Sequence, residues 1–582
     1  MDLPRITLTD KEQQLADLLV ECADWVDDNP QEVDALRLRD ENGSWIGKPR
    51  GREQVELRIA GGWVRDKLIG RASDDIDIST SPDPITGLKF ATLFEKYLEL
   101  KGQRQLMGKL TKIDAKPDQS KHLETATAIV CDLSVDWVQQ RGQEVYTEGS
   151  RIPTVAFGTP LEDAERRDLT INALFYNLRT RLIEDQTGKG LPDLGLVPNA
   201  PKQIRTPLEP FKTFHDDPLR VIRAVRFAAR FGRDYALNEQ LVEAIGREEI
   251  RAALRDPKKI SRERVGIELE KMLNGNDPLY AMELIDRLGL HDLVFLFESS
   301  EIDSFSNPGH PRMPQTGLAY QAAQVLASLL YPGPGSSALH PALQLKRVPV
   351  QLESVTIPPY PSETAINEVW PVTIKRLYTS CGLLPLYDLS CTEKKKVIWV
   401  GEKVVREGIK WPTHDIVWAK KAREATTLLS EAVRRSGGGL HEDSLSERGQ
   451  IGRCSCPDPL DFEGGVNDPA AFASLVEAYN RFVDRVLAFG LDRDAFKPPL
   501  LDGKQINDLL PETRGSPAMT AIMGIVVEFQ LRNPHASTED CKTFLLAQTP
   551  FIDDLLSQFS KKPAGPKRKK PQQQQGQYSK DM

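Results

Sequence analysis

Four clusters of polar and charged residues between residues 57 and 226 have the types and spacing that could do chemistry. In the first, Gly61-Gly62-Trp63-Val64-Arg65, a β-rich run ends in two glycines and a helical pattern follows. Glycines at such a junction let backbone N–H groups approach an anion, and an arginine in the first turns of the helix can reach the same anion. An ordinary strand–helix turn has the same pattern, so this cluster alone does not decide a function.

The second cluster is a pair of aspartates at alternate positions, Asp75 and Asp77. Side chains alternate along a strand, so both carboxylates project from one face while Ile76 and Ile78 project from the other. Adjacent carboxylates repel each other unless a divalent cation bridges them, and an all-oxygen donor set suits Mg²⁺. The alternative is an acidic strand edge that faces water.

A third carboxylate is expected from a neighbouring strand. Residues 133–138 alternate as a strand does, and Asp136 lies within that apolar pattern. Asp132 competes for the role, but it lies at the expected turn between two β-rich runs. We therefore predict Asp136 as the third acid, with a solvated strand residue as the alternative.

The third cluster combines Arg166, Arg167, Asp168 and Asn172 beside residues 170–178, a run with a helix-like pattern. Arginine suits phosphate, whereas aspartate and asparagine suit hydroxyl groups. The alternative is the capped start of a helix with an ion pair at the surface.

The fourth cluster lies on a predicted helix that Asp216 or Asp217 can cap. Arg220, Arg223 and Arg226 recur at every third position, so they stack roughly on one face of that helix. Three stacked guanidinium groups repel one another unless anions are near. A solvated basic face with a local ion pair to Asp217 is the alternative.

These clusters need a framework, and the pattern of the chain predicts an α+β fold. Four β-rich runs, separated by glycines and helical stretches, lie at residues 55–60, 76–80, 125–130 and 133–138. An amphipathic helix is expected at residues 9–26, and helix periods dominate from about residue 206. We predict a mixed-sheet head followed by three all-α domains and a disordered basic end: head 1–205, neck 206–275, body 276–495 with insertions at 299–365 and 435–468, tail 496–560, and end 561–582.

Composition is that of a large globular protein. The chain has 582 residues, 40% hydrophobic and 27% charged, and no apolar run approaches the roughly 18 residues of a membrane span. Its seven cysteines form no CxxC pair and its eight histidines form no cluster, which indicates free thiols and argues against a His-bound metal. The net charge of -8 is unfavourable for nucleic-acid binding, but local positive charge matters more than the total.

The motifs also follow the order of a known family. The strings IAGGWVRD, DDIDI, RRDLTINAL, DDPLRVIRAVRF and SRERVGIELEKML occur between residues 59 and 273. This set is similar to the class II tRNA nucleotidyltransferases, the CCA-adding enzymes, and specifically to the eukaryotic type. A weaker likeness continues at residues 499–503 and 529–534.

The resemblance implies a polymerase β-like head and a template-independent enzyme that adds C, C and A to the 3′ end of tRNA. CTP and ATP would be the substrates, two Mg²⁺ ions the cofactors and tRNA the macromolecular partner, with no obligate protein partner. The matched positions imply metal ligation by Asp75 and Asp77, a third acid at Asp136, triphosphate contacts from Gly61, Gly62 and Arg65, ribose contacts from Arg167, Asp168 and Asn172, and base contacts from Asp217, Arg220 and Arg223. Asp216 stands where the family has glutamate.

Base selection follows from donors and acceptors. The Watson–Crick edges of C and A each offer an amino donor beside a ring-nitrogen acceptor, so Asp217 can accept and Arg220 can donate. U and G present the reverse pattern and would leave charged groups unsatisfied, at a cost on the order of several kcal/mol.

Other readings stay open. Relatives that add only CC or only A, and poly(A) polymerases, share the head motifs, and an inactive RNA-binding scaffold is a different class. The basic cluster at residues 567–570 is typical of nuclear import, and the family commonly serves nucleus, cytoplasm and mitochondrion. Residues 1–28 have neither a secretory nor a mitochondrial leader pattern.

Overall fold

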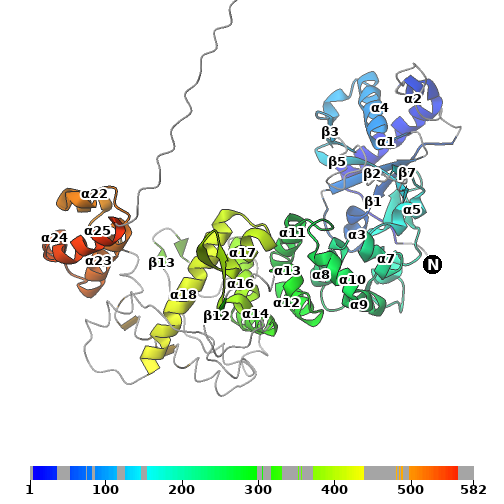
Figure 1. Cartoon of the computed structure of the whole chain (residues 1–582). Coiled ribbons are helices and arrows are strands. Elements are labelled where there is room, and N and C mark those ends of the chain that lie inside the picture. The colour runs from blue at the N-terminus through cyan, green and yellow to red at the C-terminus, as the bar shows by residue number, and fades with distance from the viewer. Residues whose placement is uncertain are drawn as a thin grey trace, which may run out of the picture. The chain divides into compact units, whose positions relative to one another are not determined.

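The computed structural model describes residues 4–35, 53–73, 75–81, 85–113, 125–145, 154–297, 304–305, 316–330, 351–352, 355–356, 371–437, 497–560 and a few positions from 477 to 490. The chain divides into two compact units: Met1–Gln324 with Trp370–Ala419, and Val325–Val369 with Lys420–Met582. Most of the predicted insertions and the whole of the end 561–582 lie outside the described residues. In the first unit a mixed sheet precedes a long series of helices, which confirms the predicted α+β class (Figure 1).

The head is built on a seven-stranded sheet in the order β3-β4-β5-β2-β1-β8-β9. All neighbours are antiparallel except β2 and β5, which run parallel. The strands are β1 (Glu56–Ala60), β2 (Asp75–Ser81), β3 (Thr111–Ile113), β4 (Thr125–Val130), β5 (Leu133–Gln139), β8 (Leu174–Asn177) and β9 (Ile183–Asp185). All four β-rich runs of the sequence are therefore strands.

One expectation about the sheet is wrong. The run after Asp168 is not helical: a short 3₁₀ turn, η3 (Thr170–Asn172), leads directly into β8. All four residues of β8 are buried. A strand buried on both faces shows no alternation of apolar and polar residues, so its period of two is hidden from a sequence reading.

Helices cover the apolar face of this sheet (Figure 1). Helix α1 (Asp10–Asp28) begins with a capping box at Thr9, which confirms the predicted first helix, and packs with α2 (Pro30–Ala35) and α4 (Gly87–Leu100). Ile76, Ile78 and Trp137 are almost wholly buried. The ring of Phe94, on α4, packs near the Trp137 ring, with the two ring centroids 6.4 Å apart. The alternation along β2 therefore turns Asp75 and Asp77 to the opposite face.

The remaining elements of the head are short. They are α3 (Gly62–Leu68), η1 (Arg104–Leu106), the antiparallel pair β6 (Arg141–Val145) and β7 (Thr154–Phe157), α5 (Pro160–Glu165) and α6 (Gly190–Asp193).

Helices follow the head within the first unit. They are α7 (Pro210–Asp216), α8 (Leu219–Phe231), α9 (Glu239–Gly246), α10 (Glu248–Arg255), α11 (Arg262–Leu273), α12 (Pro278–Arg287) and α13 (His291–Val294), with the two-stranded sheet β10 (Gln203–Ile204) and β11 (Ala236–Leu237) beside them. Helix α8 packs against both α11 and α12. It ends at Gly232, whose φ of 90° places it in the left-handed region that favours glycine.

Further along the chain lie α14 (Gly317–Leu330), α16 (Pro371–Leu383), η6 (Leu384–Leu386), α17 (Val400–Lys403), the π-helical turn η7 (Val404–Gly408) and α18 (Thr413–Gly437). A three-stranded sheet of β12 (Ser304–Phe305), β15 (Leu389–Glu393) and β16 (Lys396–Trp399) accompanies them. Strands this short carry too few residues to interrupt the helical periodicity of the sequence. None of the described helices is long and apolar enough to cross a membrane.

The second unit contains a separate core. It is formed by α22 (Gly503–Leu509), η9 (Pro511–Thr513), α23 (Met519–Arg532), α24 (Thr538–Ala547) and α25 (Thr549–Ser560) around buried residues such as Ile522, Val526 and Leu545. The short strands β13 (Gln351–Leu352) and β14 (Val355–Thr356) also belong to this unit. The predicted domain boundaries remain predictions.

Candidate active site

A single pocket of about 510 Å³ gathers most of the predicted site residues. Its walls come from the β1–α3 turn, the loop after α5, helix α8 and the start of α11. Ten of the twelve predicted residues line it: Gly61, Gly62, Arg65, Asp77, Arg167, Asp168, Asn172, Asp217, Arg220 and Arg223. The other two, Asp75 and Asp136, are exposed and do not line it.

The three predicted acids nevertheless converge on one face of the sheet. In the parallel pair β2–β5, Asp77 stands opposite Asp136, while Asp75 lies two residues earlier on β2. Burial raises the pKa of Asp77 to about 6; the charge of Arg167 opposes this rise, and the charges of Asp136 and Asp75 add to it. These carboxylates are therefore close enough to repel one another.

The acids fit Mg²⁺ by their chemistry. The described residues contain no group of three His, Cys, Asp or Glu side chains placed to hold a metal ion. Mg²⁺ needs only one or two carboxylates when substrate phosphates complete its shell, and Asp75 and Asp77 offer oxygen donors alone. Burial, together with the charges of Asp136 and Asp75, raises the pKa of Asp77, and a bound cation would oppose this rise.

The turn before α3 requires glycine. Gly61 has a φ of 74°, and a Cβ at this position would lie 2.7 Å from Nη1 of Arg167. The N–H of Gly61 donates to the carbonyl oxygen of Leu174 at 3.0 Å, so this N–H is already used within the protein. The turn therefore lets Arg167 approach the backbone and starts the helix that carries Arg65.

A continuous polar chain links α3, the segment after α5 and α8. Arg65, only 3% exposed, donates to Asn172 Oδ1 and to Asp66. Asn172 Nδ2 donates to Asp168 Oδ1 at 2.9 Å, and Arg223 Nε donates to Asp168 Oδ2 at 2.7 Å. Burial alone would raise the pKa of Asp168, but Arg223 and Asn172 hold it below its usual range. Asp168 is therefore a buried anion between two arginine-bearing helices.

Arg167 is held from two sides. Its Nη2 donates to Asp163 of α5 at 2.9 Å, and its Nη1 donates to the carbonyl oxygen of Asn172 at 3.0 Å. The guanidinium also lies 5.1 Å from the ring centroid of Phe175. These contacts fix the Arg167 cation near Asp77, where its charge opposes the upward shift of the Asp77 pKa.

Asp217 and Arg220 both line the pocket but bond to different partners. Asp217 Oδ1 accepts from the N–H of Leu219 at 3.1 Å, and its Oδ2 accepts from Arg264 at 3.0 Å. Arg220 donates to the carbonyl oxygens of Arg166 and Thr213 at 2.7 and 3.4 Å. The alternative of a local ion pair between Asp217 and Arg220 is therefore not the arrangement found.

The pocket also holds residues outside the twelve predicted ones. Arg166 and Arg226 belong to the third and fourth clusters of the sequence, whereas sequence reasoning missed Val138, Gln139, Asp163, Phe227, Arg230 and Arg264. Arg264 lies in the SRERV string on α11, 47 positions from its partner Asp217. Nothing in the spacing of one sequence links two residues so far apart, although a basic residue in the first turn of an amphipathic helix is a weak signal.

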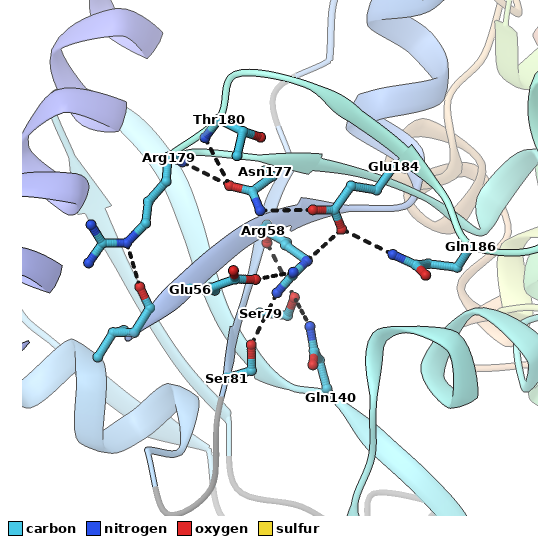
Figure 2. Close-up of polar contacts among 11 residues, drawn as sticks. Glu56, Arg58, Ser79, Ser81, Gln140, Asn177, Arg179, Thr180, Glu184 and Gln186 are labelled. Carbon is cyan, nitrogen blue, oxygen red and sulfur yellow. Dashed lines mark hydrogen bonds and ion pairs between the residues drawn. The ribbon is translucent and has the colours of Figure 1, made fainter. Parts of the chain in front are cut away.

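A second polar cluster lies on the same face of the sheet as Asp77, since Arg58 and Ala60 of β1 pair with Ser79 and Asp77 of β2. Figure 2 shows the Arg58 guanidinium bonded to Glu184 Oε2 at 2.7 Å, Ser81 Oγ at 3.1 Å and Glu56. Arg58 is 7% exposed.

The Arg58 cluster joins several strands (Figure 2). Asn177 of β8 donates to Glu184 of β9 at 2.8 Å, and Gln140 donates to Ser79 of β2 at 3.3 Å. Through Arg58 and Glu184 these contacts connect β1, β2, β8 and β9.

Comparison with known proteins identifies the chain's relatives. Residues 57–196 match the family described as the Poly A polymerase head domain, and residues 247–301 match the probable RNA and SrmB-binding site of polymerase A. The mitochondrial CCA tRNA nucleotidyltransferase of Saccharomyces cerevisiae is 32% identical over 94% of this chain and 95% of the yeast protein. A tRNA nucleotidyltransferase of Schizosaccharomyces pombe is 30% identical over 93% of this chain and 98% of its own length.

A solved structure supports the fold. An apo form of a CCA-adding enzyme aligns with 93% of this chain and 96% of its own, with a TM-score of 0.50 and 18% identity. Because the two fungal relatives match this chain over nearly its whole length, the chain belongs to the CCA tRNA nucleotidyltransferase family.

Proposed function

We propose that this protein adds C, C and A to the 3′ end of tRNA from CTP and ATP, without a nucleic-acid template, and releases pyrophosphate. Family membership over almost the whole chain supports this function. The observation that carries it to particular residues is the single pocket that ten predicted site residues line.

The arginines of the pocket provide the triphosphate site in this proposal. Arg65 comes from α3 and Arg223 from α8, and the chain of hydrogen bonds through Asn172 and Asp168 holds the two in a fixed relation. Guanidinium groups suit phosphate oxygens because they present several N–H donors in one plane. Asp168, Asn172 and Arg167 would also meet the ribose hydroxyls.

Asp217 and Arg220 would select the base. Two of the five N–H groups of Arg220 bond to backbone carbonyls, which fixes the plane of the guanidinium while other donors remain for the ring nitrogen of C or A. Arg264 donates to Asp217 Oδ2, which fixes the orientation of that carboxylate as an acceptor for the amino group. U and G would oppose acceptor to acceptor and donor to donor.

Asp75 and Asp77 would hold Mg²⁺, with Asp136 beside them and next to the attacking 3′-hydroxyl. When bound, Mg²⁺ lowers the pKa of the hydroxyl and stabilises charge on the phosphates and the leaving pyrophosphate. The protein's own part is to align the hydroxyl with the α-phosphate and to place the arginines around the leaving group.

The deciding experiment offers the purified protein three tRNAs: one lacking CCA, one lacking only A, and one complete. We expect extension by three nucleotides, by one and by none, with CTP and ATP used and UTP and GTP refused. Product length separates the alternatives. A CC-adding enzyme adds two nucleotides to the tRNA lacking CCA and none to the tRNA lacking A, an A-adding enzyme adds one nucleotide to the tRNA lacking A alone, and a poly(A) polymerase makes long A tracts. No incorporation at all would leave an inactive scaffold.

A double substitution, Asp75→Ala with Asp77→Ala, tests the proposed metal ligands. We expect loss of incorporation by at least about 10³-fold because the charge that holds Mg²⁺ is gone. Asp132→Asn is the matched control, since Asp132 lies at the β4–β5 turn with its side chain 81% exposed and pairs with Lys11. Activity of the double variant equal to that of the control would remove the proposed mechanism.

We also propose the division of labour along the chain. Residues 206–275 would read the base, and residues 496–560 would bind tRNA together with the body. The relatives from Saccharomyces cerevisiae and Candida glabrata are described as mitochondrial, which supports a mitochondrial role in addition to nucleus and cytoplasm. Fluorescent fusions at the C-terminus of the full reading frame test this distribution.

A further inference from the structure

One aromatic side chain lies among the arginines of the pocket. Eight arginines but only four aspartates line the cavity, so its lining is strongly positive. Among the described lining residues Phe227 is the single aromatic one, and it is 3% exposed. A buried phenylalanine in the wall of a polar pocket needs a physical reason.

Three guanidinium groups surround the Phe227 ring. Their central carbons lie 5.1 Å (Arg65), 5.7 Å (Arg223) and 4.1 Å (Arg226) from the ring centroid. Arg65 comes from α3, whereas the other two share α8 with Phe227. A cation within about 6 Å of an aromatic centroid is attracted by the negative face of the ring. Phe227 therefore attracts arginines from two different elements to one place.

Repulsion among these arginines makes that attraction necessary. Burial lowers the pKa of the Arg226 guanidinium, and the neighbouring charge of Arg223 lowers it further. Each of the three also bonds to a carboxylate, Arg65 to Asp66, Arg223 to Asp168 and Arg226 to Glu268. Further carboxylates would cancel the positive charge that a triphosphate requires. An aromatic ring attracts the cations and carries no net charge.

The ring itself is held in place by its own helix. Phe231, four residues further along α8, stacks on Phe227 with centroids 6.1 Å apart and ring planes 15° apart. Tyr235 lies 4.9 Å from Phe231, so aromatic side chains follow one another at every fourth position. Arg65 also lies 5.7 Å from the Phe231 ring. Phe227 is thus a fixed support rather than a mobile side chain.

We propose that Phe227 is a positioning residue for the triphosphate: its ring holds Arg65, Arg223 and Arg226 in the arrangement that binds the phosphates of CTP and ATP and the pyrophosphate product. The inference rests on the proposed function and goes beyond it, because Phe227 acts through the arginines and contacts no reacting atom.

The test replaces the ring and keeps an apolar side chain, Phe227→Leu. We expect the KM for CTP and for ATP, and the Kd for pyrophosphate measured by calorimetry, to rise about tenfold. The KM for tRNA should stay within about twofold, because the proposed role of these arginines is confined to the phosphates of the nucleotide. Phe227→Tyr keeps the ring and should restore nucleotide KM to within about threefold of the wild-type value.

Phe90→Leu is the matched control, since Phe90 of α4 is completely buried under the apolar face of the sheet and no arginine lies over its ring in the described residues. Thermal unfolding of all variants separates folding from binding. A loss of stability with unchanged nucleotide KM and pyrophosphate Kd in Phe227→Leu, or equal KM effects in Phe90→Leu, overturns the inference. Failure of the wild-type protein to extend any tRNA overturns the proposed function instead, and the pyrophosphate measurement distinguishes the two.

Discussion

At the scale of single residues, Asp77 carries a charge that burial makes costly. Burial and the nearby acids raise its pKa to about 6, so at neutral pH Asp77 is mainly ionised and, without a cation, its charge lowers the stability of the fold. A site that binds Mg²⁺ uses this cost, because the metal relieves the repulsion that the fold maintains. Stability and function therefore oppose each other at this position.

We expect Asp77→Asn to raise the melting temperature in EDTA at pH 7.5 by about 2 °C, although it abolishes activity. The pKa of Asp77 in the folded protein lies above its value of 3.8 in the unfolded chain. The loss in free energy of unfolding caused by its charge is therefore complete above pH 6 and absent below about pH 4. The gain should therefore shrink as the pH falls from 7.5 to 4.5. Calorimetric scans in EDTA measure it, and a gain that is constant with pH would contradict the raised pKa.

At the scale of elements, sequence patterns predicted the strands and helices that have a clear periodicity, but they missed the contacts between elements that are far apart in the sequence. The acid pair of β2 and the capped first helix were predictable because alternation and capping are local. Strand β8 was predicted as helix because burial on both faces removes its alternation. The pairing of Asp217 with Arg264, and the cluster around Arg58, depend on which elements lie side by side, and no spacing in one sequence reports that.

The ion pair between Arg58 on β1 and Glu184 on β9 should be important for the head sheet. Their side chains are 8% and 21% exposed. Glu184→Ala leaves a nearly buried guanidinium with fewer partners, and we expect a loss of about 3 kcal/mol in the free energy of unfolding. Glu21→Ala removes an exposed pair with Lys101 and should cost under about 1 kcal/mol. Urea unfolding of both variants compares them; equal losses would show that burial of this pair has no consequence.

His291 on α13 should make the helical region after the head sensitive to mild acid. It is 2% exposed, its Nε2 donates to the carbonyl oxygen of Gly382 at 2.8 Å, and its Nδ1 has no described hydrogen-bond partner. Burial lowers its pKa below the usual 6.5, so the unfolded chain takes up the proton first. The contribution of neutral His291 to the free energy of unfolding is therefore complete above about pH 6.5, and it is lost as the pH falls below that value.

The variant His291→Gln tests this, because glutamine can donate to Gly382 but cannot take up a proton. Urea unfolding between pH 7.5 and 5 should show a smaller loss of stability in the variant than in the wild-type protein. His535→Gln, at an exposed side chain, is the matched control. Parallel curves for wild type and His291→Gln would contradict the assignment.

At the scale of the whole molecule, the net charge of -8 conceals a pocket lined by eight arginines and four aspartates. The lining is therefore positive although the chain is acidic, so nucleotide binding does not need a basic protein. The helices α22 to α25 of the second unit are held by a core of their own residues. The pocket lies entirely in the first unit.

Removal of residues 497–582 should therefore raise the KM for tRNA by about tenfold and leave the KM for CTP and ATP within about twofold. The reason is that the proposed tRNA contacts extend into α22 to α25, whereas every lining residue of the pocket remains. Steady-state kinetics with tRNA and with each nucleotide varied in turn provide the measurement. An unchanged KM for tRNA would exclude these helices from substrate binding.

The turn at Gly61 also has a genetic consequence. Every missense change of one base in a glycine codon introduces a side chain with a Cβ, and at this position a Cβ meets both a φ of 74° and the Arg167 guanidinium 2.7 Å away. Each single-step substitution therefore strains the backbone and requires the Arg167 guanidinium to move, so we expect none of them to be neutral. A homologous chain without glycine here would have to place the Arg167 guanidinium differently, and it would therefore hold the nucleotide differently.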